Sequence, residues 1–274
     1  MSLNFCILSS GSSGNCSVIW TEKATILIDC GCSIKYITKN LSNLGISTKN
    51  LTATVITHGH TDHMSPSVFS LLFKNNIPIY LHKDVFEDLF RKYGKKIEKC
   101  TNILFNKTFK IENIYIKPFY VHHKDQYVTR TFGFTFSSIV NTKEYKIGYI
   151  TDTGKICNEI IKNLVNSNIL IIESNYDEAM LESSLRFHDN KKWVSSDWGH
   201  LSNESAADAI VKIRQLSNNK ENLKYVFLAH ISKHHNNVKI AIDTTKKILT
   251  KNGISNISLF ATKNKKRCPS IKII

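Results

Sequence analysis

Several common features of protein sequences are missing from this chain of 274 residues. No apolar run approaches the roughly 18 to 20 residues that a helix needs to cross a bilayer, so no membrane span is expected. The N-terminal residues MSLNFCIL lack a basic stretch ahead of their apolar residues, so no signal peptide is expected either. The chain also has no low-complexity linker and no solenoid repeat. These absences favour an ordinary globular protein away from the membrane.

Cysteine spacings typical of zinc ribbons and redox motifs are absent as well. The chain has 7 cysteines, an odd number, and no two of them are spaced C-x-x-C. Such cysteines are typical of free, mostly buried thiols in a reducing compartment, which predicts a cytoplasmic location. Cys30 and Cys32 are interpreted as small packing residues. With 42% hydrophobic residues, the chain can bury one large core or two fused halves of one sandwich, so residues 1–274 are expected to form a single domain.

Acidic residues are scarce relative to basic ones. The chain has 22 Asp and Glu against 37 Lys and Arg, which gives a formal charge of +15. Basic side chains that neutralise phosphates supply most non-specific affinity for nucleic acid. Nearly all the basic residues are lysine, however, and the chain is rich in Asn and Ile, which is also what an AT-biased genome would produce. The charge supports a polyanionic substrate without establishing one.

Short strands and helices alternate along the chain, which predicts an α/β fold, a four-layer αβ/βα sandwich. Ligand residues are expected on the loops at strand ends, where sheet scaffolds usually place their chemistry. Strands are predicted at residues 6–10, 17–20, 24–29, 53–57, 77–81, 114–121, 132–138, 145–151, 168–174, 225–230 and 257–260. Helices are predicted at residues 33–44, 66–75, 83–94, 155–165, 203–216 and 237–253.

The segment of residues 57–63 reads THGHTDH and directly follows an apolar run. Imidazole and carboxylate groups suit a borderline divalent ion such as zinc. Side chains two apart at a strand end point the same way, so His58 and His60 can share one ion. Asp62 and His63 are then free to face a second ion. A histidine-rich surface turn is the alternative, but four ligand-type residues rarely fall in so tight a pattern without selection for binding.

The pattern H-x-H-x-D-H after a strand resembles the signature of the metallo-β-lactamase fold. That resemblance implies further ligands at later strand ends and an aspartate that braces the metal loop. The chain supplies candidates in the expected order, namely Asp29 as the brace, His122 or His123, Asp152 as a carboxylate that bridges two metals, and His230.

A closer similarity is to the YycJ/WalJ-like family of small nucleases, from about residue 7 to about residue 240. It rests on SSGSSGNC, ILIDCG, ITHGHTDH, TDTG, ESNYDEAML, GHLSNESAA and LAHISKHHN. The similarity implies a first ion on His58, His60 and His123, a second on Asp62, His63 and His230, and Asp152 between them. It also implies that Asp62 orients the attacking hydroxide, and that Asp29, Asn15 and His235 support the metals or contact substrate.

Two positions depart from the family pattern, and one position is ambiguous. Gly59 stands where the family usually has glutamate, and Lys124 where it usually has aspartate; neither is a metal ligand. Strand alternation puts His122 and His123 on opposite faces, so only one of them can reach the metal. Similarity to the family's V-x-H pattern favours His123.

His200 stands in GHLSNESAADAI, just before a predicted helix. Helix N-termini attract anions through their unpaired amides and dipole. The segment resembles the histidine-containing motif of the transfer-RNA 3′-processing endonucleases, where the histidine is thought to assist the leaving group. His200 is therefore implied as a general acid beside a bound phosphate. A capping or packing histidine remains the alternative.

Together, these resemblances imply a metal-dependent phosphodiesterase that acts on nucleic acid, most like a 5′-to-3′ DNA exonuclease. Two divalent ions, zinc or manganese, would hold a bridging hydroxide that attacks phosphorus. DNA is favoured over RNA, and the oligomeric state is left open. A hydrolase of small molecules such as cyclic nucleotides, lactones or thioesters, with the same dinuclear site, is the alternative; His200 argues against a hydrolase of small thioesters.

Overall fold

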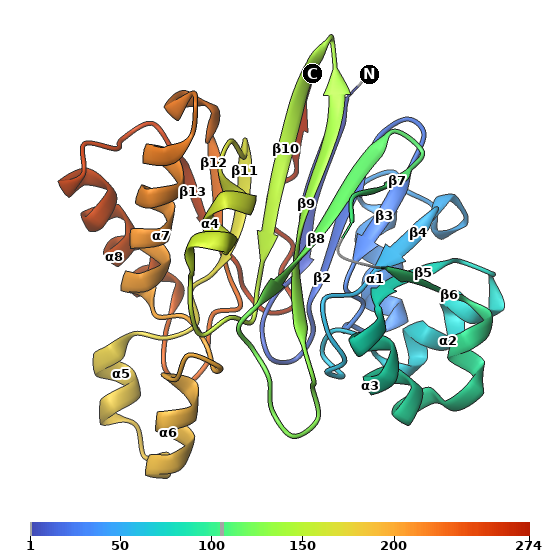
Figure 1. Ribbon diagram of the computed structural model, residues 1–274, viewed down its shortest axis with the longest axis horizontal. Coiled ribbons are helices and arrows are strands. Elements are labelled where there is room, and N and C mark those ends of the chain that lie inside the picture. Colours follow the sequence, from blue (N-terminus) through green and yellow to red (C-terminus); the bar gives the residue numbers. More distant parts are fainter. Residues whose placement is uncertain (1, 105–106) are drawn as a thin grey trace.

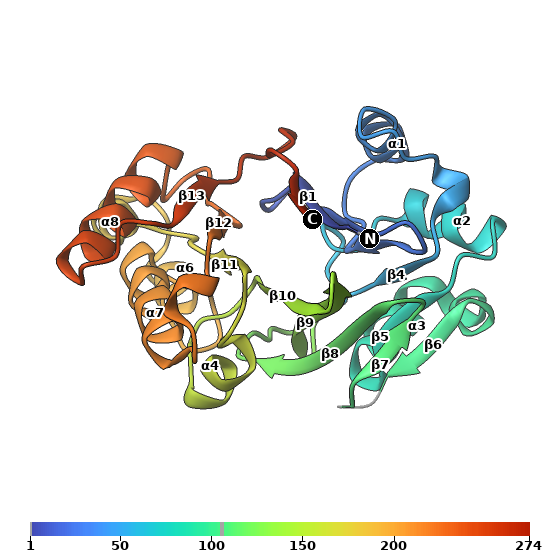
Figure 2. The same ribbon diagram turned by 90° about the horizontal axis from the view of Figure 1, so that it is seen from above.

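The computed structural model describes residues 2–104 and 107–274, in which two sheets face each other and helices cover their outer sides (Figures 1 and 2). In spatial order, the first sheet holds β14 (Ile271–Ile273), β1 (Leu3–Ser9), β2 (Cys16–Trp20), β3 (Thr25–Ile28), β4 (Ala53–Val55), β5 (Ile79–His82) and β6 (Thr101–Leu104). The second holds β13 (Ser258–Ala261), β12 (Tyr225–Ala229), β11 (Ile169–Glu173), β10 (Lys143–Ile150), β9 (Thr131–Val140), β8 (Ile114–Val121) and β7 (Phe109–Ile111).

Helices complete the outer layers. Those beside the first sheet are α1 (Ile34–Ser42), α2 (Pro66–Lys74) and α3 (Lys83–Tyr93), and those on the second are α4 (Asn158–Leu164), α7 (Asn203–Leu216) and α8 (Val238–Lys251). Short 3-10 turns lie at Thr48–Asn50, Gly94–Lys99 and Lys220–Asn222. The order of helices, sheet, sheet and helices confirms the predicted αβ/βα sandwich. No helix of the described chain combines the length and the apolar character that crossing a membrane takes.

The main core lies between the sheets and holds residues of both. Phe5 of β1 meets Phe227 of β12 with ring centroids 5.9 Å apart, which shows the two sheets in direct contact. A second core joins the second sheet to α4, α7 and α8. Every residue of β11 is buried, because this parallel strand is covered on both faces, and its continuous apolar run reflects that position.

Strand direction determines where the site is built. β10 to β13 run parallel, and β8 runs the same way as β10 because both pair antiparallel with β9. The carboxyl ends of β8, β10 and β12 therefore share one edge of the second sheet, the lower edge in Figure 1. Two further helices, α5 (Glu178–Ser183) and α6 (His188–Val194), lie beyond this edge.

Several short elements were not predicted: α5, α6, β6, β7 and β14. Each spans three to seven residues, too few to show a hydrophobic period. Among the described residues, α5 and α6 bury only Leu181 and Val194, which pack on Tyr176 in a small cluster of their own. Tertiary contacts rather than local pattern hold such segments.

Candidate metal centre and active site

The strand ends bring all the predicted ligands into one cluster. The THGHTDH loop follows β4, while His123, Asp152 and His230 follow β8, β10 and β12. Three groups of side chains each offer ligand atoms within 4.8 Å of one another: His58, His60 and His123; His58, His63 and Asp152; and Asp62, His63 and His230. A fourth such group adds Glu173 and His200 to Asp152 and His230.

Three residues of the site adopt a left-handed backbone. The φ angles of Asp29, Asp152 and His230 are 58°, 55° and 54°. This conformation is uncommon for residues other than glycine and costs free energy. At each position the chain turns sharply at a strand end, and the side chain is buried in the cluster.

Asp29 lies against the THGHTDH loop. It is fully buried, and its carboxylate accepts hydrogen bonds from the backbone N–H of Thr57 (2.9 Å) and from Nδ1 of His63 (2.8 Å). Burial lowers the pKa of His63, but the carboxylates of Asp29 and Asp152 outweigh it and raise the pKa to about 10. A cation is thus favoured here, and a divalent ion would displace the proton on binding.

His58 and His60 lie together at the other side of the loop. Nε2 of His58 is 2.9 Å from Nδ1 of His60, and Nε2 of His60 is 3.0 Å from a carboxylate oxygen of Asp125. Burial lowers the pKa of His58 well below its usual range, so its ring is neutral and can act as a ligand. Asp125, in the loop between β8 and β9, was not predicted.

Of the two neighbouring histidines, it is His123 that the fold places in the cluster. Its Nδ1 donates to the carbonyl oxygen of Gly199 (2.8 Å), and burial lowers its pKa to about 4. Nε2 of the neutral ring then carries the lone pair that a metal would take. His122 instead contacts Trp198, with ring centroids 5.3 Å apart.

Asp152 lies between the two halves of the cluster. One carboxylate oxygen is 3.3 Å from Nε2 of His63, and the other is 3.3 Å from Nδ1 of His230. Burial alone would raise the pKa of Asp152, but the imidazoles of His230 and His63 hold it well below its usual range. The charged carboxylate is therefore positioned to contact cations on both sides.

Glu173, at the end of β11, joins His200 to the cluster. One oxygen of this fully buried carboxylate is 2.8 Å from Nδ1 of His200 and 2.8 Å from Nδ1 of His230. The other accepts from the backbone N–H groups of Thr153 (2.7 Å) and Leu201 (3.3 Å). Glu173 belongs to the segment ESNYDEAML, but it was not predicted as a site residue.

Asn15 ties the first turn of the chain to the metal loop. Its Nδ2 is 2.9 Å from Nε2 of His63 and 3.3 Å from a carboxylate oxygen of Asp62. Its backbone N–H donates to the carbonyl oxygen of Asp62 (2.7 Å), and its own carbonyl accepts from Gly31 (2.9 Å). A Cβ on Gly31 would lie 1.6 Å from that Asp62 oxygen, so only glycine fits there.

His235 lies apart from these residues. Although it is buried, no hydrogen bond or ring contact links it to the cluster in the described part of the chain; its ring neighbour is His234, with centroids 6.3 Å apart. Its backbone carbonyl accepts from Asp177, which caps α5 (2.8 Å). The backbone carbonyl of His235 therefore supports the α5 turn, its ring does not join the cluster, and its role near the metals or substrate stays a prediction.

The cluster has the properties of a metal site. In the described chain, the buried Nε2 atoms of His123 and His230 and one oxygen of Asp152 have no hydrogen-bond partner. Buried polar atoms are normally paired, so three unpaired atoms in one cluster are available to bind metal ions. Imidazoles with carboxylates are the donor set of zinc and related divalent ions.

Comparisons with known proteins identify the family. The family model described as β-lactamase superfamily domain matches residues 24–231. Exodeoxyribonuclease WalJ of Streptococcus pneumoniae serotype 2 (strain D39) is 32% identical over 240 residues, which cover 86% of this chain and 84% of the relative. The chain belongs to the β-lactamase superfamily, as a WalJ/YycJ-like protein.

Two further matches extend the comparison. Exodeoxyribonuclease YycJ of Bacillus anthracis is 26% identical over 257 residues, or 92% of this chain and 91% of that relative. The metallo-β-lactamase fold protein YhfI from Bacillus subtilis shares the fold, with a TM-score of 0.70 over 99% of this chain and all of that one, at 14% identity. This WalJ/YycJ-like chain is thus a metal-dependent hydrolase.

Proposed function

We propose that this protein is a DNA exonuclease that cleaves phosphodiesters from the 5′ end, with residues 1–274 acting as a single domain. The observation that carries the proposal is the place of His200, whose ring centroid is 5.2 Å from those of both His123 and His230. An alkoxide leaving group needs a proton donor at this position, whereas a thiolate does not. Two relatives that are named exodeoxyribonucleases support the choice of DNA.

The cluster offers places for two divalent ions, zinc or manganese. His58, His60 and His123 would hold one, Asp62, His63 and His230 the other, and Asp152 would contact both. When bound, the ions would supply positive charge to the phosphate and to the attacking and leaving oxygens, and would lower the pKa of water.

The chain's own residues orient the reactants and move the proton. Nδ1 of His200 is held by Glu173, so Nε2 is the atom left to donate a proton to the departing oxygen. The His200 side chain is 14% exposed, so it reaches the open side of the cluster. Asp62 is held by Asn15 and keeps a quarter of its side chain exposed, which suits a carboxylate that orients the attacking water.

A panel of end-labelled single- and double-stranded DNA and RNA, each with Zn²⁺ and with Mn²⁺, tests the proposal. We expect DNA to shorten from its 5′ end. His234→Ala removes an exposed histidine and is the matched control for changes at His200. If cyclic nucleotides, lactones or thioesters are hydrolysed while every nucleic acid stays intact, the protein is a small-molecule hydrolase instead.

A further inference from the structure

Trp193 of α6 lies at the rim of the cluster, and the proposed chemistry does not use it. Its ring centroid is 5.8 Å from that of His123 and 5.4 Å from that of His200, and its plane is at 89° to the latter. The residue is nevertheless 37% exposed. A large aromatic ring that is partly open to solvent beside two candidate active-site histidines is available for contact with a bound ligand.

The turn after α6 holds the indole in place. The backbone N–H of His200 donates to the carbonyl oxygen of Val194 (2.8 Å), and the Gly199 carbonyl accepts from Nδ1 of His123. A Cβ on Gly199 would lie 2.0 Å from the carbonyl oxygen of Trp193, so the turn requires glycine. The contacts that position the two histidines therefore also position Trp193.

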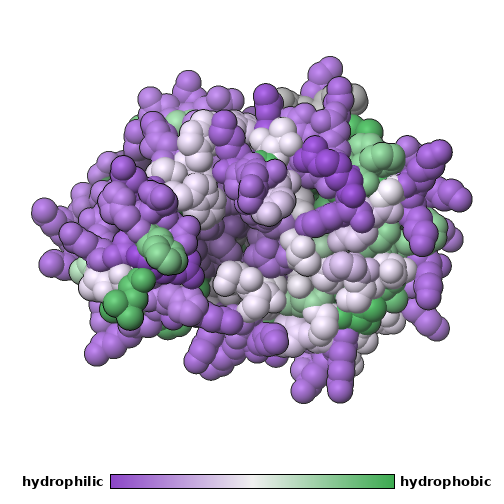
Figure 3. Space-filling view, turned by 90° about the horizontal axis from the view of Figure 1, so that it is seen from below, coloured by the Kyte–Doolittle hydropathy of each residue, from purple (hydrophilic) through white to green (hydrophobic). Residues whose placement is uncertain are grey.

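Charge on the same rim complements a phosphate chain. Lys124 follows His123 directly, and its Nζ lies 4.3 Å from the ring centroid of Trp198. Lys92 of α3 borders the cluster as well, because its Nζ donates to the carbonyl oxygen of Gly59 in the THGHTDH loop (2.7 Å). The face that bears α5 and α6 is shown in Figure 3, where a hollow near the middle is bordered mainly by hydrophilic residues. An exposed aromatic ring combined with nearby lysines is the usual composition of a surface that binds single strands.

We propose that Trp193 stacks on the nucleobase beside the scissile phosphate, an inference that rests on the proposed nuclease function. Every base presents a π face, so such stacking binds DNA of any sequence. Trp193 is then a binding residue that places the phosphate on the cluster, and it takes no part in bond breaking. Its contribution should appear in KM and depend on the presence of the base.

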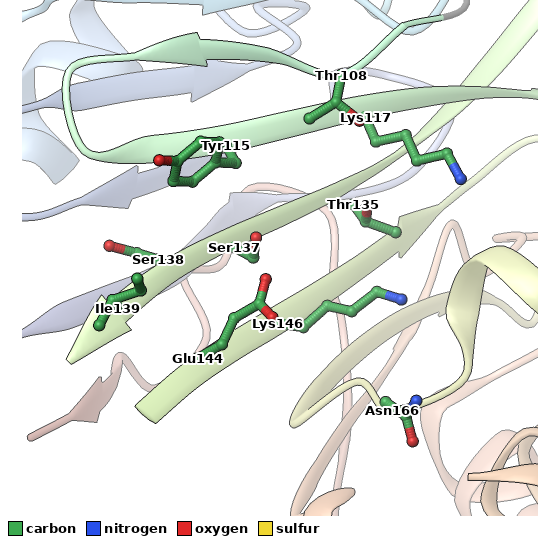
Figure 4. A pocket seen from close by; sticks show the side chains of 10 residues that line it. All are labelled: Thr108, Tyr115, Lys117, Thr135, Ser137, Ser138, Ile139, Glu144, Lys146 and Asn166. Carbon is green, nitrogen blue, oxygen red and sulfur yellow. The ribbon is translucent and has the colours of Figure 1, made fainter. Parts of the chain in front are cut away.

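Tyr115 provides a matched control. It is 41% exposed, similar to Trp193, but it lies at the amino end of β8, whereas His123 follows the carboxyl end of that strand. Tyr115 lines a separate pocket of about 530 Å³ on the open face of β8, β9 and β10, together with Lys117 and Lys146 (Figure 4). None of the predicted site residues lines that pocket.

Steady-state kinetics on single-stranded oligonucleotides test the inference. We expect Trp193→Ala to raise KM about ten- to a hundredfold, with a small change in kcat, because one base–aromatic stack is lost. Trp193→Phe should recover much of the loss, and Tyr115→Ala should behave as the wild type. On oligonucleotides with an abasic residue beside the scissile phosphate, wild type and Trp193→Ala should have the same KM.

Three results would overturn the stacking role: an unchanged KM on intact DNA, an equal loss on abasic and intact DNA, or a loss of bound metal in Trp193→Ala. The last two would show that the indole only packs the histidines. If the wild type degrades no nucleic acid, the proposed function fails separately. Stacking is then decided by calorimetry, in which the wild type, but not Trp193→Ala, should bind dAMP more tightly than deoxyribose 5-phosphate.

Discussion

At the scale of single residues, each histidine of the cluster has a second partner that orients its ring. Carboxylates orient four of the rings, a backbone carbonyl orients one, and a hydroxyl orients one: Asp29 holds His63, Asp125 holds His60, Glu173 holds His200 and His230, the Gly199 carbonyl holds His123, and Oγ1 of Thr57 lies 3.1 Å from Nδ1 of His58. Loss of such a partner typically costs about 10- to 100-fold in metal affinity or activity. Substitution of these partners therefore tests the site without removing a ligand.

Glu173→Gln keeps the shape of the side chain but replaces one carboxylate oxygen with an amide nitrogen. In the wild type, Oε1 lies 2.8 Å from the Nδ1 atoms of two imidazoles, and Oε2 accepts hydrogen bonds from two backbone N–H groups. A glutamine Nε2 cannot accept a hydrogen bond, so on one side it would face hydrogen-bond donors. We expect kcat/KM on DNA to fall about 10- to 100-fold. Glu144→Gln, at an exposed position of β10, is the control, and equal rates for the two variants would contradict this role.

His200→Ala should keep its metal and its fold yet lose about 10²- to 10⁴-fold in turnover on DNA, the usual value of a positioned general acid. The loss should shrink on bis(p-nitrophenyl) phosphate, because nitrophenolate departs without a proton. Rates on both substrates, with metal content measured in parallel, provide the check. A variant that cleaves DNA as fast as the parent would reduce His200 to a packing residue.

The THGHTDH motif marks four of the predicted ligands by its spacing, and the family resemblance implied the others at the ends of apolar strands. Glu173 also ends such a strand, but a lone carboxylate there has no spacing that marks it. Asp125 is 65 residues from His60 in sequence, and only the fold of the loop after β8 brings the two together. The residues that orient the ligand histidines are brought to them by tertiary contacts, and the spacing of residues along the sequence does not reveal such contacts.

At the scale of elements, the turns that contain Asn15 and Gly31 pack through their backbones against the THGHTDH loop. Gly31→Ala would place its Cβ 1.6 Å from the Asp62 carbonyl oxygen, so the loop must move. Overpacking of this kind costs about 1–3 kcal/mol, which lowers Tm by on the order of 5 °C in a chain of this size. We expect bound metal to fall as well, because Asp62 belongs to the moved loop.

Gly45→Ala is the control for this element. Nothing lies within 4 Å of the added carbon, so only its positive φ of +74° carries a cost. Calorimetry measures Tm and metal analysis measures bound metal in both variants. If Gly31→Ala and Gly45→Ala bind the same amount of metal, the Gly31 contact does not hold the THGHTDH loop in place.

Long elements were predicted, and so were short strands that lie in an apolar run, such as the three residues of β4, whereas short elements without such a run were not. The expected strand at residues 114–121 coincides with β8. Buried and exposed side chains alternate along the first half of this strand, as is typical of a half-buried strand. The three residues of β14 pair with β1 from the far end of the chain, and nothing local marks them. The same holds for α6, although it carries Trp193 to the cluster.

At the scale of the whole molecule, the charge of +15 predicts how the proposed binding of DNA depends on salt. Lysines that contact phosphates release counterions, so affinity should fall at least about tenfold between 50 and 200 mM salt and should vary little with sequence. Lys124→Ala should reduce the slope of log K against log salt by about 1. Fluorescence titrations measure both, and an affinity that stays flat with salt would count against a polyanionic substrate.

We propose that one cluster at the strand ends holds two divalent ions, with Asp152 between them. Metal analysis of the folded chain under saturating Zn²⁺ or Mn²⁺ tests it most directly. We predict two ions per chain, and a loss of metal in His58→Ala, because a three-histidine set cut to two loses affinity and geometry. A wild-type protein that holds at most one ion per chain under both conditions would contradict the claim.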